Sequence, residues 1–90
     1  MFIFVPIMPK AIDDIDGYKF YFYSKEGNEP PHIHVKKAGG EAKFWLTPDV
    51  ILEYHFNFIV QELKKAVKLV FDNKDTLINQ WNDYFNRYTD

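Results

Sequence analysis

Residues 32–46 read HIHVKKAGGEAKFWL, and this stretch decides the fold because two segments of alternating character flank a pair of glycines. Alternation of apolar and polar side chains is typical of a β-strand with one buried face. We expect the chain to turn at Gly39-Gly40, where a positive φ costs glycine little. The stretch therefore predicts an antiparallel β-hairpin.

The two faces of this hairpin differ in chemistry, and the parity of pairing is the same for a two-residue and a four-residue loop. The apolar face comprises Ile33, Val35, Ala42, Phe44 and Leu46. The other face comprises His32, His34, Lys36, Glu41, Lys43 and Trp45. With the four-residue loop, Lys36 also lies opposite Glu41, which is a favourable cross-strand pair.

Strand character continues on both sides of the hairpin. Residues 18–24 (YKFYFYS) alternate, with Tyr18, Phe20 and Phe22 on one face and Lys19, Tyr21 and Tyr23 on the other. A loop around Gly27-Asn28 follows, and Pro30 and Pro31 lack a backbone N–H, so strand pairing should begin only at about His32. Residues 50–56 (VILEYHF) are expected to form a further strand, although Thr47 or Asp49 could instead cap a short helix.

Beyond Phe58 the period of the apolar residues becomes helical. The stripe consists of Leu63, Val67, Val70, Leu77, Trp81, Tyr84 and Tyr88. Asp72-Asn73 could divide this segment into two helices, and one long bent helix is the alternative. The expected fold class is α+β in a single domain (1–90): a small antiparallel β-sheet of three to five strands in a meander (8–56), covered on one face by one or two C-terminal helices (58–89).

The composition describes a small folded protein rather than a disordered one, since 47% of its 90 residues are hydrophobic and 19% are aromatic. A net charge of -2 argues against holding duplex nucleic acid by overall field, although a local basic patch is compatible with it. The absence of cysteine excludes disulfides and thiolate sites. The opening MFIFVPIM is too short to span a bilayer, so we expect no membrane contact and a cytoplasmic location.

His32 and His34 form a candidate metal half-site. Two residues apart on a strand, their Cα atoms lie about 6.5 Å from each other, and both imidazoles can reach one ion. A zinc site needs at least a third protein ligand, for which the candidates are His55, Glu29, Glu41, Glu53, Asp13, Asp14 and Asp16. None has a spacing that demands it, so the expectation is no cofactor, with zinc or another transition metal as the alternative.

The same two histidines are candidate catalytic residues. Imidazole titrates near neutral pH, so the pair could cleave RNA as general acid and base, with Lys36 or Lys43 holding the phosphate. The chain has no Gly-rich phosphate loop, no cysteine and a single serine, which argues against triad chemistry. The simplest interpretation is an open face whose histidines contact solvent or a partner, and the alternative is that another segment of the chain covers it.

Together these residues define a predicted basic aromatic face on an acidic protein. It comprises Lys19, Tyr21, Tyr23, His32, His34, Lys36, Lys43 and Trp45, with Glu41 as its only acid. Such a composition suits a protein interface, and it also suits single-stranded RNA. An exposed sheet edge makes a homodimer a further expectation.

The stretch from Met8 to Leu46, with its EGNEPPHIHV and EAKFWL motifs, resembles the short bacterial domain of unknown function 4160, and residues 61–85 are similar to that family's closing segment. The resemblance covers nearly the whole chain and carries no established activity. Members are often encoded beside a second short domain, in an arrangement similar to type II toxin–antitoxin pairs, which implies a protein partner encoded nearby.

Two departures from the family pattern stand out. The pattern usually begins at Met-Pro, here Met8-Pro9, so residues 1–7 look like an N-terminal extension or an upstream start. Residues 47–61 replace a Gly-polar helix start, which leaves the helix onset open, and His55 is outside the motif, which weakens it as a ligand.

Overall fold

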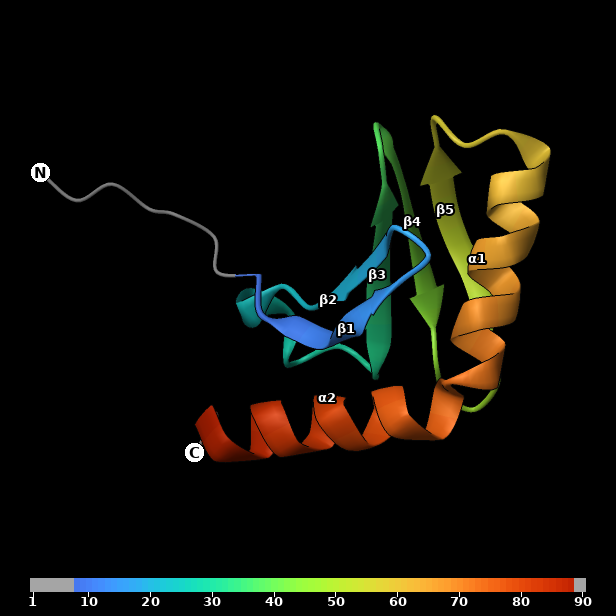
Figure 1. The fold of residues 1–90 in the computed structure, drawn as a ribbon. Helices are drawn as coiled ribbons and strands as arrows, with labels where there is room; N and C mark the ends of the chain where they lie inside the picture. Colours follow the sequence, from blue (N-terminus) through green and yellow to red (C-terminus); the bar gives the residue numbers. More distant parts are fainter. Residues whose placement is uncertain (1–7, 89–90) are drawn as a thin grey trace, which may run out of the picture.

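The computed structural model describes residues 8–88, in which five strands precede two α-helices (Figure 1). The elements are β1 (Lys10–Ile15), β2 (Tyr18–Tyr21), a short 3-10 helix η1 (Ser24–Glu26), β3 (His32–Lys37), β4 (Gly40–Trp45), β5 (Ile51–Phe56), α1 (Val60–Asp72) and α2 (Lys74–Tyr88). The strands form one antiparallel sheet in the order β1-β2-β3-β4-β5. The α+β meander is confirmed, and the predicted extension at residues 1–7 lies outside the described residues.

Lys36 pairs with Glu41 in the β3–β4 hairpin, as expected for the four-residue loop, but Lys37 also pairs with Gly40, so the loop itself has two residues. The turn itself lies one residue earlier than predicted, at Ala38-Gly39, and Ala38 adopts the positive φ of 52°. Gly40 instead begins β4. A Cβ at Gly40 would lie 2.6 Å from the Phe58 ring and 2.8 Å from the Asn57 carbonyl oxygen. Glycine is needed there for close approach of the chain after β5 rather than for its φ.

The core lies on the predicted apolar face of the sheet. Ile33, Val35, Ala42, Phe44 and Leu46 are fully buried together with Tyr18, Phe20 and Phe22 of the neighbouring segment. Alternation along the strands therefore identified this face correctly, because a pleated strand points successive side chains to opposite sides.

The helices complete the core with a stripe that differs in part from the predicted one. Val70, Leu77 and Trp81 are buried as expected, but Ala66 and Phe85 are buried too, and Val67 is 39% exposed. The face of α1 is therefore turned toward Ala66, which belongs to the core cluster. The side chain of Tyr88 lies outside the described residues.

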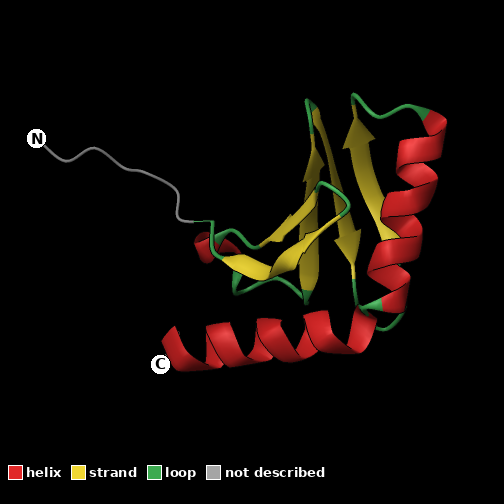
Figure 2. Ribbon diagram, in the orientation of Figure 1, coloured by secondary structure: helices red, strands yellow, loops and turns green. Residues whose placement is uncertain are grey.

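Asn73 separates two helices, so the alternative of one bent helix is wrong. Both the backbone N–H and the side-chain amide of Asn73 donate to the Leu69 carbonyl oxygen, at 3.1 and 2.8 Å, and end α1. The chain then changes direction sharply, and α2 runs across one end of the sheet (Figure 2). Between residues 8 and 88, neither helix has the length and apolar character needed to cross a membrane.

Candidate functional site

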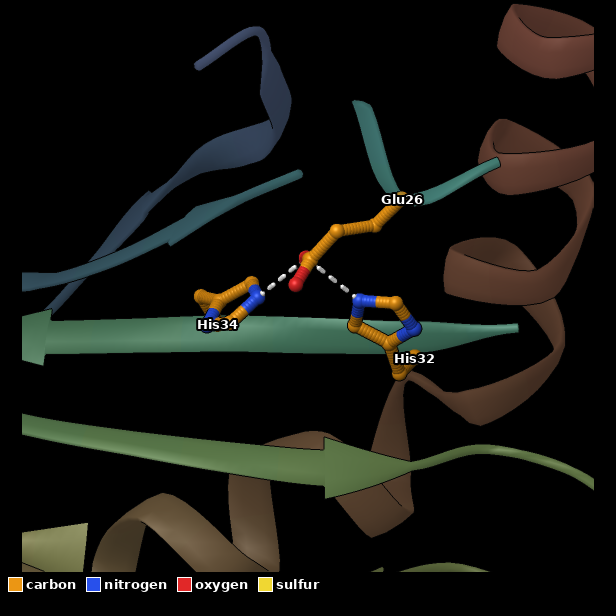
Figure 3. A group of neighbouring side chains, drawn as sticks. All are labelled: Glu26, His32 and His34. Carbon is orange, nitrogen blue, oxygen red and sulfur yellow. Dashed lines mark hydrogen bonds and ion pairs between the residues drawn. The ribbon is translucent and has the colours of Figure 1, made fainter. Parts of the chain in front are cut away.

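A cluster of one carboxylate and two imidazoles lies on the face of the sheet opposite the core. Glu26 at the end of η1 places its Oε1 atom 2.7 Å from His32 Nε2 and 2.8 Å from His34 Nε2 (Figure 3). The two rings stand side by side on β3 and point toward the same oxygen. We call Glu26, His32 and His34 the Glu–His cluster.

Local structure explains how Glu26 reaches the strand. After β2 the chain turns through η1, where the Glu26 N–H donates to the Tyr23 carbonyl oxygen at 3.1 Å and the Glu29 N–H donates to the Glu26 carbonyl oxygen at 3.1 Å. Pro30 and Pro31 then lead into β3, which begins at His32 as predicted. These successive turns fold residues 24–31 back over the strand that they precede.

The prediction that the histidines face solvent is therefore wrong. His32 and His34 are 0% and 1% exposed, and Lys43 and Tyr21 from the predicted binding face are also buried. Trp81 of α2 lies 4.7 Å from the His32 ring, centroid to centroid, and Tyr23 lies 4.3 Å from the His34 ring. The alternative, in which another segment covers this face, is confirmed for the loop after β2.

The predicted basic character of this face also fails for its central part, because Glu41 is not its only acid. Glu29 Oε1 accepts from Lys43 Nζ at 2.9 Å, and Glu53 Oε2 accepts from Trp45 Nε1 at 2.7 Å. Glu41 itself accepts from the Tyr21 hydroxyl at 3.0 Å. Glu26 and Glu29 come from the segment after β2, and Glu53 comes from β5. The prediction of this face rested on the pairing of β3 with β4, which does not include these three residues. Only Lys19 and Lys36 keep an open basic surface on the predicted face.

The hydrogen bonds of the Glu–His cluster require a shared proton. The Pro30 carbonyl oxygen can only accept, so His32 Nδ1 donates to it at 2.9 Å. His32 Nε2 then shares one proton with Glu26 Oε1. His34 Nε2 donates to the same oxygen. In the neutral ring, His34 Nδ1 then carries a lone pair and no proton. Among the described side chains, that nitrogen is the buried polar atom without a hydrogen-bond partner, and it lies 3.7 Å from Glu41 Oε2.

The electrostatics of the cluster favour an ionised acid and a neutral His34. Burial raises the pKa of Glu26, but the hydrogen bonds from His32 and His34, together with charge interactions with both rings, lower it more, and the net pKa is below the ordinary value. Burial lowers the pKa of His34, and the hydrogen bond to Glu26 offsets this only in part. A carboxylate and a neutral imidazole are the protonation states in which these side chains bind metal ions.

The geometry brings together three possible metal ligands, and only two of them had been predicted. The ligand atoms of Glu26, His32 and His34 lie within 4.8 Å of one another. Glu29 and Glu41 approach the Nδ1 atoms of the two rings, at 3.9 and 3.7 Å, rather than the converging Nε2 atoms.

The other predicted third ligands lie elsewhere. His55 is exposed on β5 and Asp13 is exposed on β1. Glu53 accepts a hydrogen bond from Trp45. Asp14 forms an ion pair with Lys10, and Asp16 forms one with Lys65. Sequence reasoning missed Glu26 although it opens the EGNEPPHIHV motif. Its position just before a proline pair and two histidines was the available signal.

Burial also weighs against the catalytic hypothesis. His32 and His34 lie beneath Glu26 and are closed in by aromatic rings, so an RNA phosphate cannot reach them without displacement of the loop. Lys36 remains accessible, with 41% of its side chain exposed. The arrangement suits a buried binding centre better than acid–base chemistry on a polymer.

Comparison with known proteins identifies a family for this chain. A family model described as "Domain of unknown function (DUF4160)" matches residues 17–82, which is more than half of the chain and includes the whole Glu–His cluster. No curated protein matches the chain. No solved structure matches it either. On the strength of the family match, this chain belongs to the DUF4160 family.

Proposed function

We propose that the protein is a metal-binding domain in which Glu26, His32 and His34 hold one divalent transition-metal ion. The ligand set supports this proposal, because two imidazoles and a carboxylate are a common combination for zinc and for iron(II). The three ligand atoms already converge in the folded chain. A fourth position would be left for water or another ligand on the side of Glu26, whose side chain is 22% exposed.

The observation that carries the proposal is the buried Nδ1 atom of His34, which makes no hydrogen bond. If His34 binds a metal ion through Nε2, its remaining proton resides on Nδ1 and points toward Glu41, 3.7 Å away. His32 already has this arrangement, with Nδ1 donating to the Pro30 carbonyl oxygen. Metal-binding histidines usually donate their second nitrogen to a carbonyl or a carboxylate in this way. A metal ion on both Nε2 atoms would thus leave each ring with a proton on Nδ1 that faces an acceptor.

Metal titration of untagged protein, first stripped with a chelator, tests the proposal. We expect one zinc ion to bind per chain in calorimetry and to raise the melting temperature. Cobalt(II) should give the visible absorption of a site with nitrogen and oxygen ligands. Glu26→Gln is expected to weaken zinc binding by about tenfold or more, because a neutral amide replaces the carboxylate.

His55→Ala is the matched control, since His55 is exposed and lies outside the cluster. The control variant should bind zinc as tightly as the natural sequence. Absence of zinc binding by the folded, chelator-treated protein would overturn the proposal. Equal zinc affinity of Glu26→Gln and the natural sequence would remove Glu26 from the ligand set.

We also propose a role as the protein-binding component of a gene pair of the toxin–antitoxin type, as the family resemblance implies. The supporting observation is a set of exposed apolar side chains on β5, at the start of α1 and along α1. It consists of Ile51, Tyr54, Phe56, Ile59, Val60, Val67 and Phe71. β5 is also an edge of the sheet. Exposed apolar groups on an edge strand and a helix are typical of protein interfaces.

Co-expression with the product of the neighbouring gene tests this second role. We expect the two proteins to co-purify, and the combined Val60→Ser and Phe71→Ser variant to bind at least about tenfold more weakly. Gln80→Ser, at an exposed position on α2 outside this set, is the control and should retain the complex. Failure of the folded natural protein to bind that partner would refute this role, as would unchanged binding by the double variant.

A further inference from the structure

Two lysines face each other across adjacent strands of the sheet. Lys19 on β2 pairs directly with Lys36 on β3. Like charges in directly opposite positions destabilise an antiparallel pair. Lys36 has the Glu41 carboxylate 3.7 Å away, whereas Lys19 makes no ion pair with any residue between 8 and 88. Of the two lysines in this repulsive pair, only Lys36 therefore has a carboxylate of the sheet within ion-pair distance.

The surface around this lysine pair is hollowed. One cavity of about 300 Å³ is lined by Lys10, Lys19, Lys36 and Tyr21, among others. A second of about 290 Å³ is lined by Lys19, Lys36 and Lys37. Lys19 and Lys36 line both cavities. We call Lys10, Lys19 and Lys36, which line the first cavity, the lysine groove.

The carboxylates near the groove also have partners of their own. Asp16 accepts from Lys65 at 2.7 Å. Glu41 accepts from the hydroxyls of Tyr21 and Tyr54, at 3.0 and 3.3 Å. Asp14 lies 3.3 Å from Lys10 in an exposed pair, which contributes little. Lys10 and Lys36 thus each lie near a carboxylate, whereas Lys19 has no ion-pair partner among residues 8–88.

One lysine of the groove also contacts an aromatic ring. The Lys36 ammonium lies 5.1 Å from the centroid of the Tyr21 ring. Such contacts orient a cation without neutralising it. The Tyr21 ring is itself only 7% exposed, so it offers no face on which a base could stack.

We infer that the lysine groove is a binding site for the phosphate groups of a nucleotide or of a single-stranded nucleic acid. A phosphate between Lys19 and Lys36 relieves their repulsion and accepts charge-assisted hydrogen bonds from both. Recognition through phosphate rather than base follows from the lack of an exposed ring in the groove. The lysine groove adjoins the Glu–His cluster through Glu41 but shares no residue with it, and the proposed phosphate contacts require no bound metal.

Binding measurements with two probes at low ionic strength test this inference. The probes are ATP without magnesium and a fluorescent single-stranded RNA oligonucleotide. At least one should bind, more weakly as salt is added, because counterions compete for the lysines. Preference for ATP would identify a free nucleotide as the source of the phosphate, and preference for the RNA would identify a nucleic acid.

The Lys19→Gln and Lys36→Gln double variant should bind the preferred probe at least about tenfold more weakly. Its control is Lys64→Gln with Lys68→Gln, an equal change of charge on α1, which should retain the affinity. The groove variant should also melt at a temperature no lower than the natural protein at low salt, because the like-charge pair is gone. If neither probe binds the natural protein, or if the control loses as much affinity, the inference is wrong.

Discussion

Replacement of Glu26 by alanine is expected to lower the free energy of unfolding of the metal-free protein by about 2–4 kcal/mol. The carboxylate is the partner of two imidazoles that are 0% and 1% exposed, and each would be left with a buried nitrogen that makes no hydrogen bond there. Removal of one partner from a buried charged hydrogen bond typically costs more than loss of a surface ion pair. Urea denaturation in the presence of a chelator measures the difference.

Two comparisons separate this effect from a general loss of charge. Glu26→Gln keeps one acceptor oxygen and should cost less than Glu26→Ala. Glu53→Ala removes a carboxylate from an exposed hydrogen bond to Trp45 and should cost less than about 1 kcal/mol. If Glu26→Ala is as mild as Glu53→Ala, the cluster contributes little to folding.

The stabilisation by Glu26 should also depend on pH in a defined direction. Since the pKa of Glu26 is lowered in the folded state, its contribution is fully present above its ordinary value of 4.5 and is lost as the pH falls below that value. The difference in stability between the natural protein and Glu26→Ala should therefore shrink in acid. A difference that grows toward acid pH would contradict the ionised carboxylate.

Replacement of Gly40 by alanine is expected to destabilise the protein by about 1–3 kcal/mol, because the added methyl group would clash with atoms of Phe58 and Asn57. Its Cβ would lie 2.6 Å from the Phe58 ring and 2.8 Å from the carbonyl oxygen of Asn57. The ring can rotate, but the carbonyl belongs to the backbone that leads from β5 into α1. The substitution should therefore displace this connection, which thermal melting and amide hydrogen exchange of residues 57–60 can detect.

Gly39→Ala is the matched control for this prediction, one residue away in the same hairpin. No atom lies within 4 Å of a Cβ built there. The control should be neutral within about 0.5 kcal/mol, as is usual for surface positions. Equal destabilisation by the two substitutions would show that the turn itself, and not the contact with Phe58, requires glycine.

The apolar side of the sheet was predictable because its evidence is local. Ile33, Val35 and Phe44 alternate with polar residues, and a strand translates that alternation directly into two faces. The helical stripe was less informative. Because the chain breaks at Asn73, the buried faces of α1 and α2 need not lie on one continuous stripe. As a result Ala66 is buried where Val67 had been expected.

The outer face shows where such reasoning ends. Strand parity placed His32, His34 and Lys43 together, which the register confirms, but it carried no information about what lies above them. The covering residues come from a loop and from α2, whose positions depend on contacts between distant segments. Glu26 and Trp81 were for this reason absent from the predicted site.

The sequence by itself determined the α+β class, the buried side of the sheet, the start of β3 after Pro31, and the membership of His32 and His34 in one surface. These properties follow from the period of the side chains and from the backbone chemistry of proline and glycine, which act over a few residues. Only the tertiary structure decided that Glu26 closes over both imidazoles and that Lys19 lies opposite Lys36. Both facts depend on how separate segments meet, through the turn at η1 and the register of β2 on β3, and no local pattern specifies that meeting.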